Sequence, residues 1–239
     1  MVHQFPTNRN PYALANDITP TLPASTPAPD LDPLAAQAYS VLRDRIVRLE
    51  IAPGSMISEN SLGTELGLSR TPVREALKRL EREYLVSIMP RRGIVVTQVD
   101  LQSQIQLLEM RRGIELRLVL RAAERASPAQ RAEMQALVPA MGAAAEAGDL
   151  QGYVALDARF DVIAEAACAN RYLADAMRPV HALIRRYWQT QDGTQGMKEA
   201  LLLHHRIVKA AADGDAEAVR AAMTGLCDWT ERYIVGQMS

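Results

Sequence analysis

Apolar residues recur every three or four positions along most of the chain, which is the spacing of one face of an α-helix. The first such segment begins at Asp32-Pro33, where a carboxylate can cap the helix and a proline suits its first turn. It ends at Pro53-Gly54. Ser58 and Ser69 can cap two further helices, and Gly67 stands between them where the chain must turn. The pattern therefore predicts three helices before residue 85.

The period of the pattern changes after Tyr84-Leu85. VSIMP and GIVVTQV are short runs rich in β-branched residues, and Arg91-Arg92-Gly93 separates them. Two such runs around a glycine-containing turn predict a β-hairpin, here with a basic tip. Three helices followed by a hairpin are the arrangement of a winged helix-turn-helix, which we expect over residues 33–99.

From Asp100 onward only the helical spacing remains. Turn signals interrupt it at Ser127-Pro128, Gly148-Asp149, Ala169-Asn170, Asp192-Gly193 and Asp213-Gly214-Asp215. These breaks predict about six helices of 15–25 residues, packed as an antiparallel bundle over residues 100–239. The expected fold is therefore mainly α, with an N-terminal winged helix-turn-helix and a C-terminal antiparallel helical bundle.

Residues 1–32 contain six prolines among threonine, serine and asparagine. Such a segment buries too little apolar surface to offset the entropy that is lost on ordering. We expect a flexible tail in this part of the chain.

Composition narrows the class of protein. A hydrophobic content of 48% with 23% charged residues is enough to build a globular core. The two cysteines, Cys168 and Cys227, argue against a disulfide framework and suit a reducing compartment. The chain start lacks the pattern of a secretory signal, and no apolar run is long enough to cross a membrane. We therefore expect a soluble, cytoplasmic protein with no membrane partner.

Charge is distributed unevenly along the chain. The net charge is −1, but residues 35–99 carry 10 basic and 7 acidic side chains, which is a net charge of +3. Residues 1–34 and 100–239 each carry a net charge of −2. A modestly basic segment within an acidic protein indicates a module that binds a polyanion.

Half of these cations lie on one expected helix. Arg70, Arg74 and Lys78 share a helical face, although like charges at this spacing destabilise an isolated helix by about 0.2–0.5 kcal/mol per pair. One explanation is a solvated face whose charges pair with Glu75 and Glu81. The other is a helix that enters a DNA groove, where arginine binds guanine through paired hydrogen bonds.

The stretch IAPGSMISENSLGTELGLSRTPVREALKRLEREYLVSIMPRRGIVV resembles the N-terminal domain of GntR-family transcription regulators. The resemblance implies that Arg70 and Arg74 contact bases in the major groove of double-stranded DNA. It also places Ser69 and Thr71 beside phosphate or base, and it places Arg92 and Gly93 at the minor groove. Some relatives carry an arginine at the start of the second helix where this chain has Asn60, so one cationic contact is missing or replaced.

The C-terminal part resembles the FCD ligand-binding domain of the FadR-like subgroup. The matching residues are Glu109, Arg111, Glu115, Asp157, Phe160, Asn170 and the GDAEA motif at Gly214–Ala218. This resemblance implies a bundle of six or seven helices that forms a homodimer and encloses a small-molecule pocket. The effectors of such domains are often organic or sugar acids.

Many such domains also hold a divalent metal such as Zn, Ni or Mn with one aspartate and three histidines. The corresponding positions here are Asp157, Asp161, His204 and Leu226, of which the last cannot bind a metal. Two carboxylates and one imidazole can still hold a cation with water completing its shell. The alternative is that Asp157 and Asp161 bind neighbouring basic groups or contact the effector directly.

Arg111 is the leading candidate for binding an effector carboxylate, because its planar guanidinium suits bidentate contacts. An internal salt bridge is the alternative role for this arginine. The other candidate effector contacts are Asp157, Asp161 and His204, and residues that can also line the pocket are His181, Arg185, Tyr187 and Trp188. His205 is expected to point elsewhere, because neighbouring residues lie about 100° apart around a helix.

The leading hypothesis is a regulator, most simply a repressor, that binds a palindromic operator as a dimer and responds to a metabolite. An activator fits the sequence equally well. A second hypothesis is a metal-dependent hydrolase tethered to DNA, built from Asp157, Asp161, His204 and Cys227. A third is a DNA binder that has no ligand.

Overall fold

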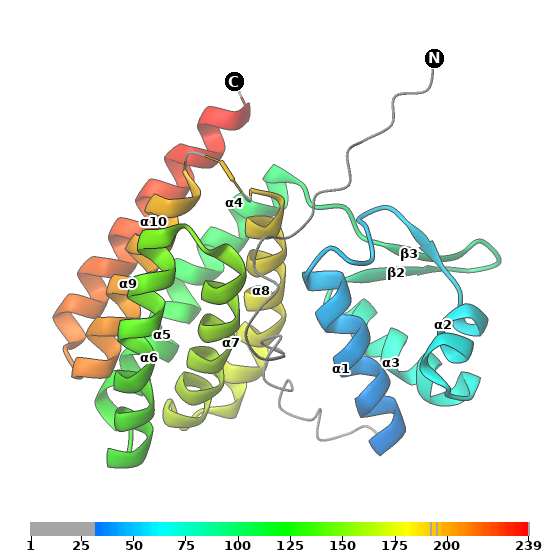
Figure 1. Ribbon diagram of the computed structural model, residues 1–239, viewed down its shortest axis with the longest axis horizontal. Helices are drawn as coiled ribbons and strands as arrows, with labels where there is room; N and C mark the ends of the chain where they lie inside the picture. Colours follow the sequence, from blue (N-terminus) through cyan, green and yellow to red (C-terminus); the bar gives the residue numbers. More distant parts are fainter. Residues whose placement is uncertain (1–31, 192, 195, 239) are drawn as a thin grey trace, which may run out of the picture.

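The computed structural model describes residues 32–191, 193–194 and 196–238, so the tail expected over residues 1–32 lies outside the described residues except for Asp32. A smaller N-terminal part, with three helices and a sheet, lies beside a larger helical bundle (Figure 1). No helix in the described residues is long and apolar enough to cross a membrane. The fold is mainly α, with a winged helix-turn-helix followed by a helical bundle, as the periodicity predicted.

The N-terminal part has the predicted order of three helices and a hairpin. Its elements are α1 (Pro33–Val47), β1 (Met56–Ile57), α2 (Glu59–Leu66), α3 (Arg70–Arg82), β2 (Val86–Met89) and β3 (Gly93–Val96). Asp32 caps α1 by accepting a hydrogen bond from Leu34 N at 2.9 Å, and Ser58 caps α2 by accepting one from Ser61 N at 3.1 Å. Ser69 takes the capping position of α3, but its side chain makes no capping hydrogen bond.

The hairpin is part of a three-stranded antiparallel sheet with the order β1-β3-β2. Val86 pairs with Val96 and Met89 with Gly93, and on the other side of β3 Met56 pairs with Val95. The sequence predicted only two strands. The third, β1, is two residues long, and a pair of residues carries no periodic signal.

One apolar core holds the N-terminal part together. It lies between α1 and α3 and is closed by the sheet, with Leu42, Leu77, Leu80 and Val96 fully buried. Ala182 of helix α8, which belongs to the bundle, is part of the same core and is also fully buried. The two parts of the molecule are therefore joined by apolar packing as well as by the chain.

The bundle consists of long helices joined by short turns at the predicted breaks. Its elements are α4 (Leu101–Met110), η1 (Arg111–Glu115), α5 (Leu116–Arg125), α6 (Pro128–Ala147), α7 (Leu150–Ala167), α8 (Arg171–Thr190), α9 (Met197–Asp213) and α10 (Ala216–Met238). The first three form one uninterrupted run, in which η1 is a turn of π-helix. Counted in this way, the described part of the bundle has six helical segments, in agreement with the sequence pattern.

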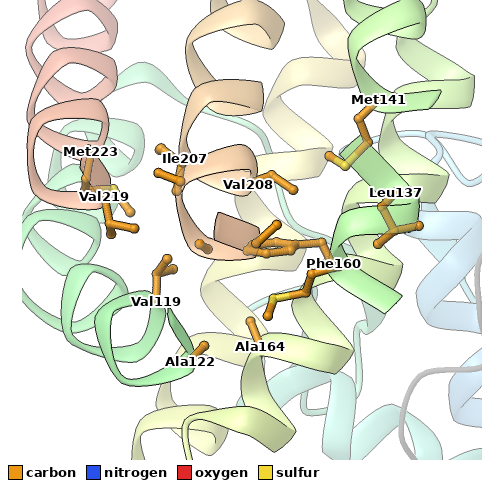
Figure 2. Packing of buried hydrophobic residues seen from close by; sticks show 14 of the residues in the cluster. Val119, Ala122, Leu137, Met141, Phe160, Ala164, Ile207, Val208, Val219 and Met223 are labelled. Carbon is orange, nitrogen blue, oxygen red and sulfur yellow. The ribbon is translucent and has the colours of Figure 1, made fainter. Parts of the chain in front are cut away.

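The bundle core is a second, larger apolar cluster. Figure 2 shows Phe160 of α7 among Val208 of α9, Leu137 and Met141 of α6, and Val119 of α5. Phe160 is 2% exposed and Val208 is fully buried. Close packing of these helices makes a rigid frame for the polar residues that α7, α8 and α9 carry beside this core.

Candidate functional site

One face of α3 is buried and the other is open to solvent. Val73, Ala76, Leu77 and Leu80 are 0% exposed, because they recur at helical spacing and pack on α1. The residues predicted to contact DNA from this helix are all exposed, and they are Ser69, Arg70, Thr71 and Arg74. In Figure 1 the tip of the β2–β3 hairpin and helix α2 extend away from the bundle.

Arg74 forms a bidentate ion pair with Glu59 of α2. Its Nε and Nη2 atoms donate to the two carboxylate oxygens at 2.8 and 2.7 Å. The hydrogen bond lowers the pKa of Glu59 and raises the pKa of Arg74. In the alternative interpretation, Glu75 and Glu81 were the partners of these cations, but Arg74 pairs with Glu59, and Glu81 accepts a hydrogen bond from Ile88 N at 3.0 Å. Because the pair is largely exposed, it fixes the direction of the guanidinium more than it stabilises the fold.

The other cations of α3 fall into two groups. Arg79 donates to the buried carboxylate of Glu83 at 2.9 Å, so its charge is compensated within the folded domain. Arg70, Lys78 and Arg82 are exposed and make no ion pair with any residue that the structure describes. These three unpaired cations, together with Arg74 in its ion pair with Glu59, form a basic face of α3 that can bind DNA phosphates.

The turn between β2 and β3 presents Arg91 and Arg92, which are both exposed. Gly93 begins β3 with a φ of +105°, a conformation that L-residues with side chains rarely adopt. A Cβ atom at this position would also lie 2.9 Å from the Met56 side chain. The glycine therefore serves the backbone geometry of the turn, and the neighbouring arginines supply its charge.

A second candidate site lies inside the bundle. It is a cavity of about 50 Å³ among α7, α8, α9, α10 and η1. The lining residues are Arg111, Glu115, Leu150, Tyr153, Val154, Asp157, Asp161, His181, Ile184, Arg185, Trp188, Ala200, Leu201, His204 and Leu226. The fold thus brings together the four candidate effector contacts, Arg111, Asp157, Asp161 and His204, with three of the four further candidates. Tyr187 does not line it, because it packs in a separate apolar cluster with Leu108 and Ile234.

Arg111 forms a buried salt bridge with Glu115 across the π-turn. Its Nε and Nη2 atoms lie 2.5 and 2.9 Å from the carboxylate oxygens, and each residue is 4% exposed. Burial raises the pKa of Glu115, but the charge of Arg111 outweighs this effect, and the pKa lies below its usual value. Arg111 therefore lines the cavity and makes the internal ion pair at the same time.

The two aspartates of α7 share one guanidinium. Arg185 Nη1 donates to Asp157 Oδ2 at 3.0 Å and to Asp161 Oδ2 at a very short distance. Asp157 and Asp161 are four positions apart and lie on the same face of α7, together with Tyr153. Burial raises the pKa of Asp161, and the positive groups of His181 and Arg185 reverse this and lower it. The aspartates therefore bind a neighbouring arginine, which was one of the two predicted alternatives.

Two imidazoles complete the polar wall. His204 Nδ1 lies 3.0 Å from the Tyr153 hydroxyl and 3.5 Å from Asp157 Oδ1. His181 Nδ1 lies 3.1 Å from Asp161 Oδ2, but the ring is not aligned for a hydrogen bond, and both of its nitrogens lack a described partner. His205 points away and contacts the Val138 carbonyl oxygen at 3.0 Å, as expected.

The cavity as described does not fit the predicted metal. Arg185 lies between Asp157 and Asp161, where a shared cation would have to bind. Leu226 lines the cavity and offers an apolar wall at the fourth ligand position. Among the described residues, no three carboxylate, imidazole or thiol groups are placed to hold a metal ion. Metal binding through Asp157, Asp161 and His204 would require Arg185 to leave, and it stays a prediction.

Cys227, which the hydrolase hypothesis included in its metal-dependent site, is fully buried in the bundle core. Burial raises the pKa of this thiol, which disfavours the reactive thiolate. Tyr153 and Glu115 are cavity residues that the sequence analysis did not propose. The spacing of 153, 157 and 161 along one helical face was a signal that could have identified Tyr153.

Comparison with known proteins gives the same division of the chain. Residues 34–96 match the model of the bacterial regulatory proteins of the gntR family, and residues 106–228 match the FCD domain. The chain is 28% identical to the HTH-type transcriptional repressor RspR of Escherichia coli K12 over 193 residues, which covers 80% of this chain and 85% of RspR. It is 30% identical to the HTH-type transcriptional regulator McbR of the same strain over 127 residues, 53% of this chain and 58% of McbR.

The structure of E. coli McbR/YncC superposes on this chain with a TM-score of 0.72 at 22% identity. The superposition covers 87% of this chain and all of that one. At this identity the likeness shows a shared fold.

Proposed function

The chain belongs to the gntR family of bacterial regulatory proteins and carries an FCD domain, and on this premise we propose that it is a repressor whose operator binding is controlled by a small metabolite. It is a transcriptional regulator with a DNA-binding domain. Repression is supported by RspR, a relative that is named a transcriptional repressor. Such a regulator acts where the DNA is, in the cytoplasm.

The observation that carries the DNA-binding role is the exposed basic face of α3. Arg70 lies at the first position of the helix, and Arg74 follows one turn later, held in a fixed direction by Glu59. A guanidinium that is already oriented loses less entropy when it binds the O6 and N7 atoms of guanine. Ser69, whose hydroxyl makes no capping bond, and Thr71 are free to contact phosphate at the helix N-terminus.

A dimer is part of the proposal. FCD-type regulators are expected to pair through the bundle, and a two-fold dimer presents two copies of α3 to two half-sites. The operator would then be a palindrome, with the hairpin residues Arg92 and Gly93 at the minor groove beside each half-site.

The effector would bind in the bundle cavity. Arg111 and Arg185 are the groups there that can contact a carboxylate, and both are paired with acidic residues in this structure. A carboxylate effector would therefore have to compete with Glu115 or with the two aspartates. Ligand binding that draws Arg185 away changes the contacts of α8, the helix that also packs on the DNA-binding part. A ligand can then shift the arrangement of the DNA-binding domains.

We expect the full chain to select a palindromic sequence from a pool of random duplexes. On that operator, Arg70→Ala and Arg74→Ala should each weaken binding by about 1–3 kcal/mol, because each removes a bidentate contact to a base. Fluorescence anisotropy with labelled operator and with a scrambled duplex measures the change.

Arg206→Ala, at an exposed arginine of α9, is the matched control and should leave operator affinity unchanged. Melting curves confirm that the variants are folded. Equal losses on operator and scrambled duplex would show that the arginines contact only phosphate. Unchanged operator affinity in both α3 variants would remove this helix from the DNA interface.

A further inference from the structure

The charges that line the bundle cavity do not balance. Glu115, Asp157 and Asp161 supply three carboxylates, whereas Arg111 and Arg185 supply two guanidinium groups. Both guanidinium groups already lie against these carboxylates. With neutral imidazoles, the cavity keeps one surplus negative charge, and a proton on His181 would bring the sum to zero. In either case a simple carboxylate anion would add an uncompensated negative charge among buried side chains, which is costly.

Residues that line the cavity carry carboxylate oxygens and imidazole nitrogens that make no hydrogen bond with a described residue. Asp157 Oδ1 and Asp161 Oδ1 accept no hydrogen bond from a described residue, because Arg185 donates only to the Oδ2 atoms. His181 is 6% exposed, and neither of its ring nitrogens has a described hydrogen-bond partner. His181 Nδ1 still lies 3.1 Å from Asp161 Oδ2, so the unused aspartate oxygens are the atoms that favour a polar ligand able to donate hydrogen bonds.

We propose that this ligand is a small amino acid-type zwitterion, with a protonated amine and a carboxylate on one short apolar skeleton. The inference rests on the proposed effector function and names the chemical class of the effector. The ammonium group donates to the unused oxygens of Asp157 and Asp161, and because it balances the ligand's own carboxylate, the ligand adds no net charge to the cavity. The carboxylate accepts hydrogen bonds from the remaining N–H groups of Arg185.

The rest of the cavity suits a short apolar skeleton. Leu201, Leu226 and Ile184 form its apolar side. A space of about 50 Å³ admits only a few water molecules, so the ligand that displaces them must be small. Trp188 also lines the cavity, and its ring stacks on Trp229 and Tyr233 with centroids 6.3 and 5.9 Å away. Binding should therefore change the tryptophan fluorescence.

The test compares amino acids with carboxylic acids that lack only the amine. The full chain is titrated with alanine and propanoate, 2-aminobutanoate and butanoate, valine and 3-methylbutanoate, and leucine and 4-methylpentanoate. Tryptophan fluorescence and melting temperature are recorded with EDTA and again with added Zn²⁺ or Mn²⁺. At least one amino acid should bind in the presence of EDTA, and its deaminated partner should bind at least about tenfold more weakly.

The proposal is overturned if a deaminated acid binds as well as its amino acid, if every response needs added metal, or if no amino acid binds. Asp157→Asn and Asp161→Asn should each weaken the responding amino acid at least about tenfold, because each removes a charged acceptor of nearly the same shape. Glu217→Gln, at an exposed carboxylate of α10, is the control and should have no effect. Unchanged affinity in both aspartate variants would also overturn the proposal.

Measuring operator binding in the absence of ligand distinguishes failure of the zwitterion proposal from failure of the proposed regulatory function. A chain that selects and binds an operator while no amino acid binds refutes only the zwitterion. A chain that shows no sequence-specific DNA binding refutes the regulatory function, whatever binds in the cavity.

Discussion

His181 and His204 line the same cavity, and their surroundings act on them in opposite ways. Burial lowers the pKa of His204, and the nearby charge of Asp157 does not reverse this. Burial also lowers the pKa of His181, but Asp161 at 3.1 Å outweighs burial and leaves the pKa raised. The folded protein therefore favours a proton on one imidazole and disfavours it on the other.

These shifts predict how the two histidines change stability with pH. The contribution of His181 is fully present below the unfolded-state pKa of about 6.5 and is lost as the pH rises through the raised pKa. The contribution of His204 is fully present above about 6.5 and is lost as the pH falls through the lowered pKa. Melting temperatures of the wild type, His181→Asn and His204→Asn should be measured from pH 5 to pH 9.

The wild type should lose stability relative to His181→Asn as the pH rises above about 6.5. It should lose stability relative to His204→Asn as the pH falls below that value. Parallel curves for the wild type and both variants would show that neither histidine titrates differently in the folded chain.

At the scale of elements, the turn between α2 and α3 sets where the basic face lies. Gly67 ends α2 in the left-handed conformation, with a φ of +66°. Leu68 N donates to Gly63 O at 2.9 Å and closes the turn. The resulting crossing of the two helices brings Glu59 to Arg74, so the position of the guanidinium depends on this one backbone conformation.

Gly67→Ala should therefore lower the free energy of unfolding by about 1 kcal/mol, because a side chain disfavours positive φ. A Cβ at this position would meet nothing within 4 Å, so the cost is conformational. Gly225→Ala, in the middle of α10, also meets open space but has no positive φ, and it should raise stability by about 0.5–1 kcal/mol. Urea unfolding measures both; equal effects of the two changes would contradict the argument.

Signals from residues close together in the sequence predicted these helices and strands well, but they predicted the contacts between elements poorly. The caps at Asp32 and Ser58 and the outward direction of Arg74 follow from neighbouring residues. The partner of Arg74 could not be predicted, because Glu59 is 15 positions away and meets it only through the crossing of two helices. The π-turn over Arg111–Glu115 has no periodic signature of its own.

The same limit applies to the cavity. Asp157, Asp161 and His204 were predicted to lie together, and they do line one cavity. The position of Arg185 between the two aspartates changes what that cavity can bind. It depends on how α8 is rotated against α7, which no spacing within one helix determines. Charge balance in a buried site is therefore a property of the packed structure.

At the scale of the whole molecule, α8 packs into two apolar cores. One is the core of the N-terminal part, which carries the basic face of α3, and the other is the bundle core beside the cavity. Arg185 lines the cavity, whereas Ala182 lies in the core of the N-terminal part. Arg43 of α1 donates to the Arg178 carbonyl oxygen at 3.1 Å. Next to Arg185, Arg186 is 1% exposed and donates to Thr97 at the end of the sheet. A rotation of α8 that moves Arg185 must therefore disturb contacts to the DNA-binding part.

Arg186 is the position where this link can be tested without a ligand. It donates to Thr97 Oγ1 at 2.9 Å and to Thr97 O at 2.5 Å, and burial lowers its pKa to about 10. Arg186→Met keeps an unbranched apolar stem but removes the guanidinium group, and with it both hydrogen bonds, which leaves the Thr97 acceptors unpaired. We expect the free energy needed to open the segment around Thr97 to fall by about 1–3 kcal/mol, because a buried polar group left without a hydrogen bond destabilises the folded state by about that amount.

For Arg186→Met, hydrogen exchange measured by mass spectrometry should be faster than in the wild type in residues 84–101 and unchanged in α9. Operator affinity should also change, although α3 itself is intact. Arg186→Lys, which keeps the charge and one contact, should lie between the wild type and Arg186→Met. If exchange around Thr97 is the same in all three proteins, Arg186 does not couple the bundle to the DNA-binding part. The coupling would then depend on the apolar contact of Ala182, which a bulkier residue at that position would disrupt.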